Sequence, residues 1–380
     1  MKKTILGGLS VEHFLREFWQ KKPLLIRQAS PGFGKLLSKE KLISLSCNEE
    51  AQSRLVCLHR RKWTLSHGPF KQRDFVKLKG NWALLVQDVN HFLPSAQLLL
   101  KAFNFIPHAR LDDLMVSFAS DGGGVGPHFD SYDVFLLQGT GKRLWQISRQ
   151  KDQSLLPDAP LRVLKNFKAE QEWLLEPGDM LYLPPNYAHH GVAVGECMTY
   201  SIGFRAPSHQ MLVNEFLFYL QDHFTISGMY TDSDLMLDQH PARISEAMID
   251  KVSTVLKKIQ FRENDIKHFL GKYLSEPKAQ VFFTPPKVLL AESKFLKLAQ
   301  QQGIHLDLKS QMLFTDKLLF MNGEDYSFKL LMRPLLKKLA DEREVSFHGK
   351  FNEQTGKLLY EWYQNGYLHL SLLSRTKARD

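Results

Sequence analysis

Apolar residues recur along the chain with two spacings, which predict where helices and strands lie. In residues 11–20, Val11, Phe14, Leu15 and Phe18 follow helical spacing after Ser10, a suitable N-cap. Short apolar runs predict strands instead, because glycine, proline or polar residues bound each of them; they cover 24–26, 114–119, 180–183 and 198–204. The runs 134–138 and 142–147, joined by Gly139-Thr140-Gly141, predict a hairpin.

The pattern changes after Pro207, where helical spacing dominates. Helices are predicted over 211–220, 244–259 and 265–274, and the first is apolar on nearly all sides. Such a helix must be buried on both sides, which predicts a dimer interface. After Pro277, helices (289–301, 333–339 and 356–364) alternate with strands (312–314, 317–320 and 367–370), a mixture typical of a winged-helix-like module. We therefore expect three domains: 1–207, 208–276 and 277–380.

One group of residues carries candidate chemistry. His128 and Asp130 begin a predicted strand, so their side chains point to the same side. With His189 they offer two imidazoles and one carboxylate, the facial triad of non-haem iron oxygenases. A structural hydrogen-bonded pair is the alternative for His128 and Asp130, and His190 is an alternative third ligand. A second His-x-Asp motif, His305 to Asp307, follows a predicted helix end and is interpreted as a chance match.

Composition narrows the class of protein. No run of 18 apolar residues occurs in the 380-residue chain, so no membrane span is predicted, and the N-terminal apolar stretch is too short for a secretory signal. Three cysteines without paired spacing fit reduced thiols in the cytoplasm and exclude a zinc ribbon or a disulfide framework. The net charge of +10 is interpreted as a scattered solvated surface, because no Lys/Arg block is long. Nucleic-acid contact is therefore expected to be incidental.

Four motifs in a fixed order carry a family resemblance. They are Gly-Pro-His-x-Asp-x-x-Asp-Val-Phe, Gln-Gly-x-Gly-x-Arg-x-Trp, Glu-Pro-Gly-Asp-x-Leu-Tyr-x-Pro-Pro and Tyr-Ser-x-Gly-Phe-Arg-Ala-Pro, within about residues 110–207. The set resembles the JmjC-type 2-oxoglutarate oxygenases, and most closely the bacterial ribosomal oxygenases that hydroxylate an arginine of a large-subunit ribosomal protein. Residues 18–26 are similar to the N-terminal segment that precedes the catalytic motifs in this family. The chain has Asn186-Tyr187-Ala188-His189 where the family often has Gly-Phe-Pro-His.

The resemblance implies an α+β fold in which a double-stranded β-helix (cupin/JmjC) barrel precedes a helical dimerisation segment and a winged-helix-like domain. It also implies that Fe(II) is held by His128, Asp130 and His189, with 2-oxoglutarate and O₂ as co-substrates. The far carboxylate of 2-oxoglutarate needs a buried cation, which a guanidinium suits best. Arg143 is the expected residue, and the alternative is a solvated arginine that covers apolar surface. Lys142 points to the opposite strand face.

The remaining site residues are expected from position alone. Ser117, Thr199 and Ser201 can donate hydroxyls to 2-oxoglutarate, or are ordinary strand residues. Tyr132 and Asp133 can face a cationic substrate, or are a core tyrosine and a turn-capping aspartate. The expected function is arginine β-carbon hydroxylation of a ribosomal protein by a cytoplasmic homodimer. Histidine hydroxylation, lysine demethylation and a non-catalytic metal-binding cupin with a nucleic-acid-contacting module are the alternatives.

Overall fold

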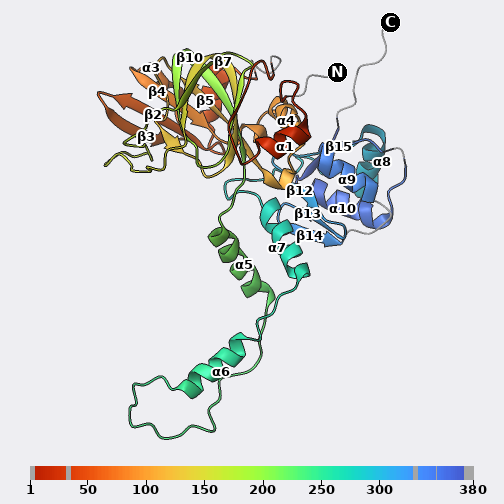
Figure 1. Ribbon diagram of the computed structural model, residues 1–380. Helices are drawn as coiled ribbons and strands as arrows, with labels where there is room; N and C mark the ends of the chain where they lie inside the picture. The colour runs from red at the N-terminus through yellow and green to blue at the C-terminus, as the bar shows by residue number, and fades with distance from the viewer. Residues whose placement is uncertain (1–4, 31–35, 328–332, 348, 372–380) are drawn as a thin grey trace. The chain divides into compact units, whose positions relative to one another are not determined.

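The computed structural model describes residues 5–30, 36–327, 333–347 and 349–371, and the chain forms two compact units (Figure 1). Unit 1 comprises Met1–Ala206, Lys278–Ser310 and Asp341–Asp380, and unit 2 comprises Pro207–Pro277 and Gln311–Ala340. Each unit is therefore built from segments that are distant in sequence.

A ten-stranded antiparallel sheet dominates unit 1, in the order β1-β9-β7-β10-β5-β4-β2-β3, with β6 on β10 and β8 on β7. Its strands are β1 (Leu24–Ile26), β2 (Ser53–His59), β3 (Lys62–His67), β4 (Asn81–Val86), β5 (Leu111–Ala119), β6 (His128–Phe129), β7 (Asp133–Ser148), β8 (Gln171–Leu175), β9 (Met180–Leu183) and β10 (Ala188–Phe204). This is the sheet of the predicted JmjC cupin-like fold, and β2 to β4 come from a segment for which no individual strands were predicted.

The predicted hairpin around Gly139 is wrong, because β7 runs unbroken from Asp133 to Ser148 and pairs with β10 along both halves. The register shifts only between Val194 and Thr199, opposite the two glycines. A Cβ on Gly139 would lie 2.7 Å from Tyr200 Cζ, and one on Gly141 would lie 2.0 Å from the Glu196 carbonyl oxygen. The glycines therefore permit close approach of β10 at an irregular register rather than a chain reversal.

Helices of the N-terminal segment pack against one face of this sheet. They are α1 (Val11–Glu17), α2 (Lys39–Ser46), α3 (Gln72–Val76) and α4 (Pro94–Lys101). Ser10 caps α1 as predicted, since its side chain accepts a hydrogen bond from the His13 amide at 3.1 Å. Phe14 of α1, Leu42 of α2 and Leu99 of α4 are fully buried with sheet residues in one core. That core fixes one side of the sheet and leaves the other side to form a cavity.

The C-terminal part of unit 1 contains α8 (Glu292–Gln302), α10 (Glu353–Gln364) and a small sheet of β15 (Glu344–Val345), β11 (Ile304–Leu306) and β16 (Leu368–Leu370). The helices α8 and α10 and the strand β16 agree with the predicted helices 289–301 and 356–364 and the predicted strand 367–370, whereas β11 and β15 lie outside the predicted ranges. Asp307, of the second His-x-Asp motif, lies 2.9 Å from His369 Nε2. Among the described residues the motif joins no group with metal-ligand geometry.

Unit 2 contains α5 (His209–His223), α6 (Glu246–Leu256), α7 (Glu263–Ser275) and a meander of β12 (Met312–Phe314), β13 (Leu318–Met321) and β14 (Glu324–Ser327). The helix α9 (Arg333–Glu342) follows. The three predicted helices are present, but within one chain α5 buries only Leu220. No helix in the described ranges is long and apolar enough to cross a membrane.

Candidate functional site

Strand pairing brings the three predicted metal ligands together. The short strand β6 pairs with the first residues of β10, and the register places His128 directly opposite His189. Directly opposite residues of antiparallel strands share one face of a sheet. Asp130 follows His128 by two residues, and its side chain joins the two rings.

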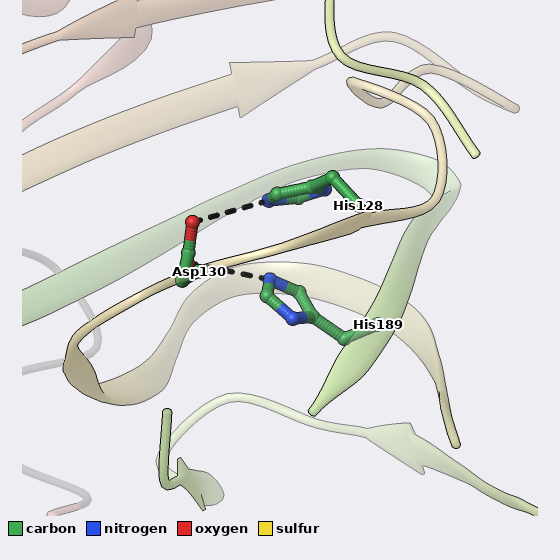
Figure 2. Close-up of side chains that lie close together, drawn as sticks. All are labelled: His128, Asp130 and His189. Atoms are coloured by element: carbon green, nitrogen blue, oxygen red, sulfur yellow. Dashed lines mark ion pairs between the residues drawn. The ribbon is translucent and has the colours of Figure 1, made fainter. Parts of the chain in front are cut away.

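The three side chains converge on one point (Figure 2). Asp130 Oδ1 lies 3.8 Å from His128 Nε2, and Asp130 Oδ2 lies 3.5 Å from His189 Nε2. The two imidazole centroids are 4.2 Å apart, and one ligand atom from each residue lies within 4.8 Å of the others. Two nitrogens and one carboxylate at this spacing are the donor set of a facial triad.

The other ring nitrogens fix the orientation of both imidazoles. His128 Nδ1 lies 2.9 Å from the Gly126 carbonyl oxygen, and His189 Nδ1 lies 3.0 Å from that of Tyr187. A proton on Nδ1 leaves Nε2 as the free lone pair, the second-sphere arrangement of metal-binding histidines. Burial, reinforced by nearby His128, lowers the pKa of His189 to about 4, which favours the neutral ring. His190 instead packs edge-on against Phe167, 6.1 Å between centroids.

The triad opens into a cavity of about 400 Å³. Its walls include residues that the sequence analysis did not single out, from β2 (Arg54), β3 (Leu65 and His67), β4 (Leu85) and the loop before β8 (Arg162). No local signal marks these residues, because β2 to β4 are distant in sequence from the ligands and are joined to them only through β5.

Arg143 lies inside this cavity and is 5 % exposed. Its Nη1 donates to Ser117 Oγ at 3.3 Å and its Nε donates to Cys197 Sγ at 3.4 Å. Its Nη2 is buried and has no hydrogen-bond partner within the part of the chain that the structure describes. Lys142 is exposed and pairs with Glu176 at 2.6 Å, so the two cations occupy opposite faces as predicted. A buried guanidinium with one unsatisfied donor fits a carboxylate ligand.

Trp145 occupies the space between Arg143 and the triad. Its ring lies 5.7 Å from the Arg143 guanidinium carbon and 5.9 Å, between centroids, from His189. The indole Nε1 is also buried without a partner among the described residues. The cavity therefore presents two unsatisfied donors on the same strand, β7.

The predicted hydroxyl donors divide into two groups. Ser117 and Ser201 line the cavity. Thr199 does not, because its Oγ1 donates to Gln138 Oε1 at 3.1 Å in the protein interior. We therefore assign Thr199 a structural hydrogen bond in place of the predicted co-substrate contact.

Tyr132 lines the cavity as predicted, but Asp133 does not. Asp133 is fully buried, and its carboxylate accepts hydrogen bonds from Tyr182 Oη at 2.7 Å, Gln20 Nε2 at 2.9 Å and Arg110 Nη2 at 3.2 Å. The predicted substrate contact of Asp133 is therefore wrong, because internal donors already occupy both carboxylate oxygens. Desolvation and the charges of Asp130 and Asp113 raise the pKa of Tyr132.

Asp113 is a residue that the sequence analysis missed. It lies on β5 with Met115 and Ser117 at alternating positions, and both of those residues line the cavity. Asp113 itself is buried and does not line the cavity: its Oδ2 accepts from Gln87 Nε2 at 2.9 Å and from the Asp88 amide at 3.2 Å, and its Oδ1 lies 3.3 Å from the position that a Cβ on Gly203 would take. Burial raises the pKa of the Asp113 carboxyl to about 7. The period-two pattern of β5 could have identified it.

Comparison with known proteins agrees with this geometry. Residues 98–212 match the JmjC domain family and residues 254–369 match the ROXA-like winged helix. The ribosomal protein uL16 3-hydroxylase of Escherichia coli (strain K12) is 36% identical over 275 residues, 72% of this chain and 74% of that protein. A probable ribosomal oxygenase of Haemophilus influenzae is 36% identical over 245 residues, 63% of this chain and 59% of that protein.

Solved structures extend the similarity to almost the whole chain. The X-ray structure of E. coli YcfD has a TM-score of 0.84 and 31% identity, and covers 96% of this chain and 99% of that one. The YcfD complex with cobalt and 2-oxoglutarate has a TM-score of 0.81 and 32% identity, and covers 95% and 98%. Both folds predicted from the sequence, the cupin-like sheet and the winged helix, are thereby confirmed. The chain belongs to the JmjC-type 2-oxoglutarate oxygenases of the bacterial ribosomal oxygenase family.

Proposed function

We propose that this chain hydroxylates the β-carbon of an arginine in the large-subunit ribosomal protein uL16, using Fe(II), 2-oxoglutarate and O₂. The observation that carries the proposal is the cavity itself, which contains the His128, Asp130 and His189 ligand set together with the buried Arg143. The choice of uL16 is supported by the name and the 36% identity of the E. coli relative.

His128 and His189 would bind the iron through Nε2, and Asp130 through one carboxylate oxygen. Their Nδ1 contacts to backbone carbonyls hold the rings in one tautomer, so little reorganisation accompanies metal binding. When bound, the iron with O₂ and 2-oxoglutarate supplies the oxidising chemistry, and succinate and CO₂ are the co-products. The protein's own contribution is to hold the reactants and to exclude water.

Arg143 would bind the far carboxylate of 2-oxoglutarate through its free Nη2. Ser117 supports the guanidinium from β5, which is separated from β7 by β10, and Ser201 offers a second hydroxyl in the same cavity. A metal-binding cupin without catalysis would have no use for a buried cation with an unsatisfied donor, which costs free energy in the absence of a ligand. The arrangement therefore favours the oxygenase over the binding protein.

Asp113 and Tyr132 would recognise the arginine of the substrate. Tyr132 lines the cavity, and Asp113, although outside the cavity lining, has its Oδ1 beside Gly203, a position without a side chain. A guanidinium pairs well with a carboxylate and stacks on an aromatic ring. Neutral histidine would gain less from Asp113, so these two residues favour arginine over histidine as the target of the iron centre.

The test is incubation of the full chain with Fe(II), 2-oxoglutarate and purified uL16. We expect uL16 to gain the mass of one oxygen atom, stoichiometric succinate, and a modified arginine in the fragment spectrum. His128→Ala should abolish all three. The matched control is His305→Ala, which changes the second His-x-Asp motif outside the cavity and should leave turnover intact.

Three outcomes would redirect the proposal. Formaldehyde release would identify a demethylase, and oxygen on a histidine would identify a histidine hydroxylase. Metal binding with salt-dependent DNA retention, but without succinate, would identify the non-catalytic cupin.

We also propose that the chain forms a homodimer through the segment 208–276. Along the sequence, this segment follows a catalytic domain (1–207) and precedes a winged-helix domain (277–380). Leu217 and Phe218 of α5 are 58% and 64% exposed, and α6 also exposes an apolar face (Met248, Ile249 and Val252). Light scattering should give a dimer mass for the native chain and a monomer mass for Leu217→Ser/Phe218→Ser. A monomeric native chain would contradict it.

The cytoplasm is the proposed location, because the free thiols Cys47, Cys57 and Cys197 suit a reducing compartment where ribosomal proteins are made. Cell fractionation should recover the chain with the cytoplasmic proteins. Recovery in the membrane or periplasmic fraction would contradict this placement.

A further inference from the structure

More than half of the chain's excess positive charge lies on one edge of the main sheet. Residues 59–80 contain seven cationic residues and one acidic residue, a net charge of six out of the chain's +10. Three cations lie at the turn between β2 and β3 (Arg60 and Arg61 in the loop and Lys62 as the first residue of β3), and four lie in and around α3 (Lys71, Arg73, Lys77 and Lys79). All seven are exposed. We call this set the basic edge.

Part of the basic edge gathers at the tip of the β2–β3 hairpin. The chain leaves β3 at the other end, where the Gly68 and Phe70 amides donate to the Ser53 and Ser46 carbonyls, and α3 then leads back towards the tip. The strand β3 is the last strand of the sheet, with β2 beside it (Figure 1). Leu58 of β2 pairs with Asn81 of β4, and a Cβ on Gly80 would lie 3.9 Å from His59 Nδ1. The residues after α3, including Lys79, therefore return beside the turn that carries Arg60 and Arg61.

No acidic side chain neutralises these cations. Within the described residues, none of the seven forms a salt bridge, although other surface lysines do, for example Lys39 with Glu196 and Lys142 with Glu176. Unpaired cations gathered on one edge produce a positive potential that attracts an anionic partner.

The hairpin turn has arginine at two positions where the backbone conformation disfavours it. Arg60 and Arg61 have φ values of 48° and 66°, and they are the two central residues of a two-residue hairpin loop. Positive φ at both positions strongly favours Asn-Gly, and arginine in this region costs free energy. The sequence therefore presents two guanidinium groups where a neutral pair would fold more favourably, which indicates a role in binding.

We infer that the basic edge binds the phosphate backbone of RNA beside the substrate cavity. Leu65 and His67 of β3 line that cavity, and Leu65 is three residues, roughly 10 Å along the strand, from Lys62. The choice of RNA rests on the proposed function. A ribosomal protein carries its own cations for RNA and would be repelled by this edge, whereas the RNA that it binds supplies the opposite charge.

The test compares two variants that each remove two positive charges from the full chain. Arg60→Asn/Arg61→Gly installs the residues that this turn prefers, so folding should be retained. Lys294→Gln/Lys297→Gln changes two exposed lysines of α8 in the winged-helix region. Binding of a fluorescein-labelled RNA hairpin is measured by fluorescence anisotropy over a series of salt concentrations, and melting temperatures check that both variants fold.

We expect the native chain and the α8 variant to bind RNA equally. The hairpin-turn variant should bind about tenfold more weakly at 0.1 M salt, and the slope of log affinity against log salt should fall by roughly 1.5. Equal binding by all three proteins, loss in the α8 variant alone, or no RNA binding by the native chain would overturn the inference.

A parallel assay separates this result from the proposed function. Succinate formation with a short uL16 peptide should be the same in the native chain and the hairpin-turn variant, because neither Arg60 nor Arg61 lines the cavity. If the peptide is not hydroxylated by the native chain while RNA binding depends on the turn, the proposed function fails and the basic edge stands as an RNA-binding surface.

Discussion

Arg143 of β7 donates to Ser117 Oγ of β5 at 3.3 Å, across the intervening strand β10, while the second terminal nitrogen of the same guanidinium has no partner among the described residues. Ser117 thus holds Nη1 in place, while Nη2 is left to bind a ligand. This division makes Arg143 a positioned ligand for a carboxylate rather than a surface cation.

Arg143→Ala should raise the KM for 2-oxoglutarate about tenfold to a hundredfold, since a hydrogen bond to a charged group contributes about 1.5–3 kcal/mol. Succinate formation is measured against 2-oxoglutarate concentration. The matched control is Lys142→Ala, on the opposite face of the same strand and paired with Glu176. An equal rise in KM in both variants would mean that general charge, and not Arg143, attracts the co-substrate.

His189→Ala should abolish stoichiometric metal binding, whereas His190→Ala should preserve it. The first histidine faces Asp130, and the second packs against Phe167 on the other side of the strand. Titration with Co(II), followed by its visible absorption, measures both. Retained binding in His189→Ala together with loss in His190→Ala would transfer the ligand role to the neighbour.

Affinity for the protein substrate should fall as the pH falls through about 7. Burial raises the pKa of Asp113 above its usual 3.8 to about 7, and the charges of Asp88 and Asp112 add to this while Lys278 opposes it. In the free protein the carboxyl is therefore mostly protonated below pH 7 and charged above it, and only the charged form pairs with a guanidinium. KM for uL16 is measured from pH 6 to pH 8.

The raised pKa of Asp113 also determines whether the free energy of unfolding rises or falls with pH. A carboxyl whose pKa is raised by folding contributes stability below its unfolded pKa, and that contribution is lost as the pH rises through the folded value. In the native chain the free energy of unfolding should therefore decrease between about pH 4 and pH 7, and Asp113→Asn should remove this decrease and flatten the KM profile. A variant profile that matches the native one would exclude Asp113 from both effects.

Asp133→Ala should destabilise the fold by about 3 kcal/mol, because it leaves the Arg110 guanidinium without its carboxylate partner and removes the acceptor of Tyr182. Urea unfolding measures the change. KM for uL16 should stay close to the native value in the folded fraction. A large change in KM with unchanged stability would restore the substrate role that the sequence suggested.

The sequence predicted the parts of this site that depend on short-range order. His128 and Asp130 follow from spacing and flanking turns, whereas the choice of His189 over His190 and the choice of Arg143 also depended on the family resemblance. Two features could not be obtained this way. Gly139 and Gly141 are typical of a turn, yet here they admit Tyr200 and the β10 backbone, a contact between residues about sixty positions apart. The carboxylate of Asp133 accepts hydrogen bonds from Gln20, Arg110 and Tyr182, three partners that are distant in sequence, and so is not available to a substrate.

The cavity walls show the same limit. Arg54, Leu65 and Leu85 reach the site because β2, β3 and β4 extend the sheet beyond β5. Nothing in their local sequence distinguishes these strands from the outer strands of any antiparallel sheet. Only the pairing of β4 with β5 brings them next to the ligands.

The indole of Trp145 lies between the guanidinium and His189, with its N–H unsatisfied. An indole so placed is a built-in optical reporter. A paramagnetic ion at the histidines quenches emission from a ring this close, and an organic acid accepting from the N–H shifts its wavelength. Loading of the two components can thus be followed separately, without labels and before any turnover.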